Sequence, residues 1–123
     1  MPLVIFVDDS ETALASTRMV TNAMPIEVKQ YTEEQTALAE IQAGMTPDLI
    51  ITDLNMPVMN GFEFLEALRK VPSTSRTPCL MLTTETKAEL KQKGKALGLT
   101  GWIVKPFNPA QLKQAITRVL RLP

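Results

Sequence analysis

Short apolar segments recur along the chain, separated by longer polar stretches. Three of them are continuous, namely residues 3–7, 49–52 and 79–83, and residues 102–104 form a fourth, shorter one. Residues 26–31 instead alternate apolar and polar side chains. Continuous apolar runs are typical of strands buried on both faces, and alternation is typical of a half-exposed edge strand. The pattern therefore predicts five β-strands, with the alternating one at an edge.

Apolar residues at helical spacing follow each expected strand. The helices expected from this spacing cover residues 11–23, a segment that ends at Gly44, a segment after Gly61, residues 86–97 and a segment that begins at Pro109. Five strands that alternate with five helices predict an α/β fold, in which a doubly wound parallel sheet is covered by helices on both faces.

The expected helix ends carry residues that favour them. Ser10 and Asn108 are good N-caps, and residues 32–35 match a capping box. Gly44 and Gly98 are suited to the left-handed conformation that often ends a helix. The local signals therefore agree with the periodicity.

Polar residues stand where four of the five expected strands end. These residues are Asp8 with Asp9, then Asp53, Thr83 and Lys105. Because parallel strands end at the same edge of a sheet, and ligands bind outside that edge, we expect the five side chains to lie together. Asp53 is the centre of the set, since a charge at the end of a buried strand must be solvated, paired or bound to a metal.

Three carboxylates and one ammonium group carry a formal charge of about minus two, which favours the binding of a cation. Mg²⁺ fits, because it prefers hard oxygen ligands. Asp9, Asp53 and a backbone carbonyl just past Asp53 would bind it, with Asp8 acting through water. Once Mg²⁺ and Lys105 offset its charge, Asp53 is able to attack a phosphorus atom and form an aspartyl phosphate.

Each of these residues also has a purely structural explanation. Asp8 and Asp9 are compatible with a simple turn before the Ser10 cap, and Asp53 with an Asx turn. Thr83 could cap the fourth helix, and Lys105 could be a solvated charge. Their joint occurrence at four strand ends favours a shared site over four separate explanations.

Composition narrows the function further. The chain has 123 residues, with 13 basic and 13 acidic side chains, so its net charge gives no argument for nucleic acid or an anionic membrane as partner. No apolar run is long enough for a membrane span and no signal peptide is apparent, so we expect a cytoplasmic protein. The chain has no histidine, so catalysis by histidine and metal sites with histidine ligands are both excluded. Cys79, the single cysteine, is expected to be a buried core thiol.

Four segments together resemble a known family. They are Val7 to Ser10, Pro47 to Gly61, Leu82 to Glu85 and Gly101 to Phe107, and they occur in the family's order. In them the chain resembles the receiver domains of two-component response regulators, and single-domain chemotaxis regulators of the CheY type most closely. The resemblance implies a flavodoxin-like sheet with strand order 2-1-3-4-5 and a single receiver domain over residues 1–123 without an output domain.

The resemblance also implies roles for individual residues. Asp53 would be the phosphoacceptor, and Asp8, Asp9 and the backbone carbonyl of Asn55 would complete the Mg²⁺ site around it. Thr83 and Lys105 would contact the phosphoryl group, and the Lys105–Pro106 peptide bond would be cis.

The implied function is that of a monomeric switch rather than an enzyme. It would take a phosphoryl group from a histidine kinase and bind a downstream target protein, such as a flagellar motor component, in chemotaxis or motility. A phosphate sink or relay intermediate is the alternative within the family.

Two residues depart from the common family pattern. Trp102 occupies the switch position, three residues before the lysine, where tyrosine or phenylalanine is more frequent. Its indole is larger and has no hydroxyl, so it is either a switch of a different kind or a half-buried anchor for an edge strand. Asn60 replaces a frequent acid, and we expect it to be a loop residue without a catalytic role.

Two rival functions remain less favoured. A phosphatase of the haloacid-dehalogenase type also uses an aspartate nucleophile with Mg²⁺, but it usually needs a second acid two residues later, where this chain has Asn55. A nucleotide-binding module would need a glycine-rich phosphate loop, and neither of the common motifs occurs.

Overall fold

The computed structural model describes residues 1–123 and contains one five-stranded sheet in the order β2-β1-β3-β4-β5. Each pair of neighbouring strands is parallel. The strands are β1 (Leu3–Val7), β2 (Glu27–Tyr31), β3 (Leu49–Thr52), β4 (Cys79–Thr83) and β5 (Gly101–Val104). The predicted α/β fold and its strand order are therefore confirmed.

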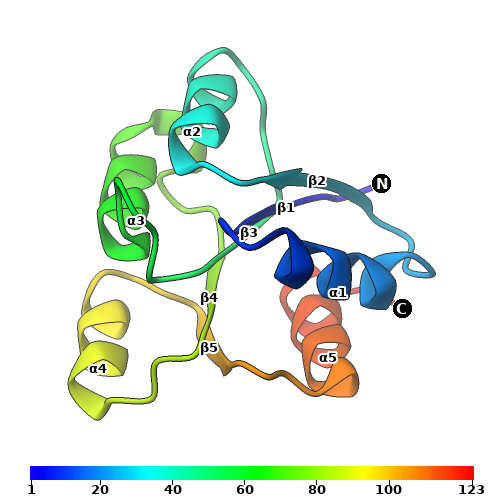
Figure 1. Cartoon of the computed structure of the whole chain (residues 1–123). Coiled ribbons are helices and arrows are strands. Elements are labelled where there is room, and N and C mark those ends of the chain that lie inside the picture. The colour runs from blue at the N-terminus through cyan, green and yellow to red at the C-terminus, as the bar shows by residue number, and fades with distance from the viewer.

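Five α-helices cover the two faces of this sheet (Figure 1). Helices α1 and α5 lie side by side on one face, and α2, α3 and α4 lie on the other. The helices are α1 (Glu11–Thr21), α2 (Glu34–Gln42), α3 (Gly61–Lys70), α4 (Ala88–Ala96) and α5 (Pro109–Leu120), and a short 3₁₀ turn, η1 (Pro72–Thr74), lies before β4. None of the helices combines the length and the apolar character needed to cross a bilayer.

The two sheet faces build two hydrophobic cores. Alternate residues of a strand point to opposite faces, so Val4 and Phe6 of β1 pack under α1 and α5, and Ile5 and Val7 pack under α2 and α3. Burial on both faces explains why β1, β3 and β4 are continuous apolar runs. Cys79 is fully buried, and burial raises the pKa of its thiol to about 12, so it is the core thiol that was expected.

Several predicted helix ends are confirmed. Ser10 Oγ accepts a hydrogen bond from the backbone N–H of Ala13 at 3.2 Å, and Asn108 Oδ1 accepts one from Ala110 at 2.8 Å. Gly44 and Gly98 both have positive φ angles after their helices. Asn60, expected to be a plain loop residue, caps α3 in a reciprocal capping box with Glu63.

One predicted helix cap and one structural explanation are wrong. The capping box at residues 32–35 does not form: Glu33 is the N-cap of α2 and makes no side-chain hydrogen bond there, and the next side chain, Glu34, is buried instead. Helix α4 begins at Ala88 with Lys87 as its N-cap, so Thr83 does not cap it. At Glu34, burial of the side chain outweighs the local preference for a capping box.

Gly61 is the residue at which α3 meets the end of β3. A methyl group on this residue would lie 2.5 Å from the backbone oxygen of Asp53 and 3.0 Å from Leu54 Cα. Because backbone atoms cannot move aside cheaply, Gly61→Ala should lower the free energy of unfolding by about 1–3 kcal/mol in urea titrations. The exposed Glu66→Ala on the same helix should change it by less than about 0.5 kcal/mol. Equal stability of the two variants would contradict the close packing at Gly61.

Candidate functional site

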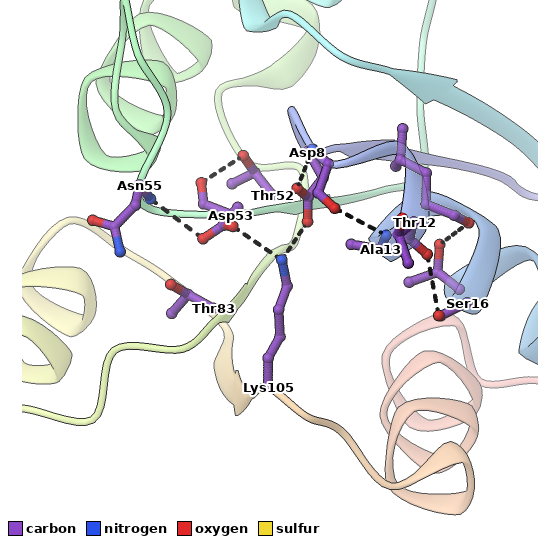
Figure 2. Close-up of polar contacts among 12 residues, drawn as sticks. Asp8, Thr12, Ala13, Ser16, Thr52, Asp53, Asn55, Thr83 and Lys105 are labelled. Carbon is purple, nitrogen blue, oxygen red and sulfur yellow. Dashed lines mark hydrogen bonds and ion pairs between the residues drawn. The ribbon is translucent and has the colours of Figure 1, made fainter.

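The carboxyl edge of the sheet holds a lysine between two carboxylates (Figure 2). Lys105 Nζ donates a hydrogen bond to Asp8 Oδ2 and lies 3.0 Å from Asp53 Oδ2. The side chains of Lys105, Asp8 and Asp53 are only 16%, 7% and 12% exposed. Shielding from water makes such ion pairs stronger than those on an open surface. Lys105 is therefore not the solvated charge of the structural explanation.

The strand register brings these three residues together. Val7 of β1 is paired with Thr52 of β3, so the residues that follow them, Asp8 and Asp53, lie next to each other. The backbone N–H of Asp53 donates to the carbonyl of Val7 at 3.0 Å, which holds the two strand ends in place. Lys105 follows β5 directly, and the cis Lys105–Pro106 bond that the resemblance implied is present.

Asp53 uses its two carboxylate oxygens differently. Oδ1 accepts hydrogen bonds from the backbone N–H groups of Leu54, at 2.6 Å, and Asn55, at 3.3 Å. Oδ2 faces Lys105. Asp53 is therefore both an Asx-turn residue and a member of the charged cluster, and the turn fixes the direction in which its second oxygen points.

Asp9 completes the acidic group. Asp8, Asp9 and Asp53 each present a carboxylate oxygen, and the three oxygens lie within 4.8 Å of one another. Asp8 is buried, Asp53 is half-buried and Asp9 is exposed, so the cluster opens to solvent on the side of Asp9. Three oxygen donors at this separation form a set that a hard divalent cation is able to occupy.

Burial, hydrogen bonds and neighbouring charges shift two pKa values in the cluster. Burial raises the pKa of Asp8, although the hydrogen bonds from Lys105 and from the backbone of Ser10 act in the opposite direction, and the charge of Asp53 adds to the rise. Burial lowers the pKa of Lys105, but the hydrogen bonds to Asp8 and Asp53 outweigh it and leave the pKa above its ordinary value. The two carboxylates thus favour the charged form of the Lys105 ammonium.

Thr83 lies at the same edge, at the end of β4 (Figure 2). Its side chain is fully buried, and its Oγ1 accepts a hydrogen bond from the backbone N–H of Glu85 at 3.4 Å. The structure therefore brings all five polar strand-end residues to one edge of the sheet, as their order along the chain predicted.

Trp102 lies outside this cluster but is connected to it through Glu85. Its indole Nε1 donates to the backbone carbonyl of Glu85 at 2.9 Å. The Glu85 side chain in turn accepts a hydrogen bond from Asn55 Nδ2 at 3.2 Å. Glu85 belongs to one of the segments that resemble the family, but neither its spacing nor the resemblance predicted a role for it. Its place just past Thr83, as a third polar residue at that strand end, was the available signal.

The indole of Trp102 fits into a narrow space between α3 and α4. Its ring centroid lies 6.3 Å from that of Phe62, and the ring lies so close to Gly94 that a methyl group on that glycine would be 3.4 Å from Cζ3. Trp102 is half-buried, as expected for an anchor, and it is also hydrogen-bonded to the loop after Thr83. Trp102 is therefore placed so that both proposed roles, an anchor for β5 and a switch, are compatible with its contacts.

Comparison with known proteins gives consistent matches over almost the whole chain. Residues 4–117 match the family described as "Response regulator receiver domain". The crystal structure of chemotaxis protein CheY4 from Vibrio cholerae superposes with a TM-score of 0.90 at 46% identity, over 97% of this chain and 98% of that one. Chemotaxis protein CheY-3 from Vibrio cholerae is 31% identical over 94% of this chain and 89% of its own length.

Longer proteins match as well. RpfG of Xanthomonas campestris, named as a cyclic di-GMP phosphodiesterase response regulator, is 31% identical over 97% of this chain, but the chain spans only 32% of its length. The chain spans 53% of PhoB from Rhizobium meliloti, a transcriptional regulatory protein. Both matches cover almost the whole of this chain, including the strand ends that carry its acidic edge. The chain therefore belongs to the response regulator receiver domain family.

Proposed function

We propose that the chain is a phosphorylation-controlled switch in which Asp53 accepts a phosphoryl group from the phosphohistidine of a histidine kinase. The observation that carries this proposal is the position of Asp53 Oδ2, which lies at the end of a central strand, 3.0 Å from Lys105 Nζ and among two further carboxylates. A nucleophilic carboxylate needs such a setting, because an unscreened acidic cluster would repel an incoming phosphoryl group.

The transfer needs no water and no further co-reactant. The N–P bond of the phosphohistidine breaks as an O–P bond to Asp53 forms, and the donor imidazole keeps the electron pair of the broken bond. Lys105 is held between Asp8 and Asp53 by its hydrogen bonds, so its ammonium is already placed to contact the phosphoryl oxygens. The Thr83 hydroxyl lies at the same edge and would donate to another of these oxygens.

Mg²⁺ is the cofactor that suits the donor set. Asp8, Asp9 and Asp53 supply carboxylate oxygens within 4.8 Å of one another, and the backbone carbonyl of Asn55, on the loop after β3, would add a further ligand. When bound, Mg²⁺ would offset the excess negative charge and coordinate an oxygen of the phosphoryl group.

The switch would run from Thr83 through Glu85 to Trp102. Thr83 and Trp102 both hydrogen-bond to the backbone of Glu85, at 3.4 Å and 2.9 Å. A movement of the Thr83 hydroxyl toward a phosphoryl oxygen would shift this backbone and repack the indole against Gly94 and Phe62. A target protein that prefers one of the two arrangements would then bind in a phosphorylation-dependent way.

The resemblance to CheY4 and CheY-3 over most of their lengths supports a place in chemotaxis or motility, with a flagellar motor protein as a possible target. We propose that residues 1–123 form a cytoplasmic, monomeric receiver domain. It would catalyse only its own phosphorylation and dephosphorylation. A phosphate sink is the alternative. Tracking swimming cells with and without the gene, and with Asp53→Asn, tests the place in motility: unchanged reversal frequency would exclude direct control of a motor.

Phosphorylation is expected to depend on Asp53 and on Mg²⁺. Incubated with acetyl phosphate and MgCl₂, the wild type should gain the mass of one phosphoryl group, whereas Asp53→Asn should gain none, because an amide is not a nucleophile toward phosphorus. The exposed acid Glu66, changed to glutamine, provides the control and should leave labelling intact. Equal labelling of the wild type and Asp53→Asn would rule out Asp53 as the phosphoacceptor.

Lys105 is expected to stabilise the acidic cluster when no metal is bound. Lys105→Ala should lower the metal-free unfolding free energy by about 1–3 kcal/mol, because it leaves two largely buried carboxylates without their cation. Added MgCl₂ should then raise the melting temperature more in this variant than in the wild type. Lys113→Ala, an exposed lysine on α5, should respond as the wild type does. A Mg²⁺-induced rise no larger in Lys105→Ala than in Lys113→Ala would contradict this role.

Trp102 fluorescence is expected to report the switch. Beryllofluoride with Mg²⁺ mimics an aspartyl phosphate, and it should change the emission of Trp102, the only tryptophan, in the wild type. The change should be much smaller in Thr83→Ala, which lacks the hydroxyl, and should persist in Thr84→Ala, a substitution of the exposed neighbour. If Thr83→Ala responded like the wild type, the route from Thr83 to Trp102 would have to be abandoned.

A further inference from the structure

Glu34 is a buried acid at a position where an exposed one is expected. It is the first residue of α2, yet it is only 2% exposed. Its Oε2 is the one buried side-chain nitrogen or oxygen of the chain without a hydrogen-bond partner. Buried polar atoms are nearly always paired, so an unpaired carboxylate oxygen points to a missing donor or cation.

The fold places Glu34 beside the acidic edge. Tyr31, the last residue of β2, is paired with Val7, and its carbonyl accepts the backbone N–H of Asp8 at 3.0 Å. The chain segments that continue past this pair lead to Asp9 on one side and to Glu34 on the other. The two acidic residues thus follow adjacent strand ends.

The groups that act on the pKa of Glu34 agree with this placement. Burial raises the pKa of its carboxyl, the backbone N–H groups of Glu34 itself and of Met59 act in the opposite direction, and the charges of Asp9 and Glu33 add to the rise. Met59 belongs to the loop after β3, and Asp9 to the loop after β1. The carboxyl group is therefore near both of the loops that carry the candidate metal ligands.

The charged and capping groups of this edge are already engaged elsewhere. Lys105 binds Asp8 and Asp53, and the backbone N–H groups of Leu54 and Asn55 bind Asp53 Oδ1. The backbone N–H of Asn60 is used within the capping box of α3. A bound Mg²⁺ commonly keeps several of its waters. These waters are hydrogen-bond donors, and this edge would gain them only when the metal binds.

We propose that Glu34 is an outer acceptor of the divalent-cation site, and that its Oε2 accepts a hydrogen bond from a water bound to the ion that Asp8, Asp9 and Asp53 hold. This inference rests on the metal site of the proposed function and adds a residue to it. Glu34 positions the ion through water and does not coordinate it. Metal binding then also links the start of α2 to the loops after β1 and β3.

Mg²⁺ titration by isothermal calorimetry tests the role of Glu34 without any measure of phosphorylation. Glu34→Gln should weaken Mg²⁺ binding about tenfold, which is the lower end of the effect typical of residues that support metal ligands through hydrogen bonds. Glu33→Gln is the matched control, because Glu33 is exposed and is the residue next to Glu34, so the substitution removes the same charge. It should change the Mg²⁺ affinity less than about twofold at physiological salt.

Glu34→Asp is the second variant, since it keeps the charge but withdraws the oxygen by one methylene group. It should also weaken Mg²⁺ binding, by more than Glu33→Gln does. In thermal melts, MgCl₂ should raise the melting temperature of both Glu34 variants less than that of the wild type, which gives a second reading if one variant folds poorly.

Equal Mg²⁺ affinities for Glu34→Gln and Glu33→Gln, with normal binding by the wild type, would overturn this inference and leave the proposed function standing. Full affinity in Glu34→Asp would also overturn it, because a general effect of charge would then suffice. Absence of Mg²⁺ binding in the wild type would instead remove the metal site itself, and with it both this inference and that part of the proposed function.

Discussion

The close approach of like charges at the carboxyl edge of the sheet is the constraint on which the rest of this structure depends. Asp8 and Asp53 follow paired residues of adjacent strands, so the sheet itself forces their carboxylates together, and Asp9 adds a third. Lys105, at the end of β5, is the cation that lets this arrangement fold, because it hydrogen-bonds to both buried carboxylates. One ammonium group still leaves the cluster with more negative than positive charge. On that excess rests the proposal that the edge binds a divalent cation and a phosphoryl group.

The acidic edge is connected to Trp102 through the backbone and the side chain of Glu85. Glu85 receives a hydrogen bond from Asn55 on its side chain and one from Trp102 on its carbonyl, and its own N–H reaches the buried hydroxyl of Thr83. Gly94 leaves room for the large indole beside α4. The loop at Glu85 is thus held by three separate partners, and this arrangement is the basis of the switch route that we propose.

Membership of the receiver family places these features in a shared architecture. The match covers nearly the full length of the Vibrio cholerae chemotaxis proteins, but only a third to a half of RpfG and PhoB. The matching segment is therefore nearly the whole of the two chemotaxis proteins and only a part of the two longer regulators. In this chain the acidic edge also includes a buried acid at the start of α2, which the strand-end pattern alone does not reveal.

The sequence by itself determined the order of the elements and the side chains that meet at one edge. Continuous apolar runs identified β1, β3 and β4, and the caps at Ser10 and Asn108 depend only on residues within one turn, so local rules suffice for them. Parallel strands end together, so Asp53 and Lys105 were predicted as neighbours although 52 residues separate them. Only the tertiary structure decided the burial of Glu34, where residues 32–35 favoured an exposed capping box, and the partners of Glu85, which come from 30 and 17 residues away. These outcomes depend on how loops pack against one another, and neither periodicity nor propensity contains that information.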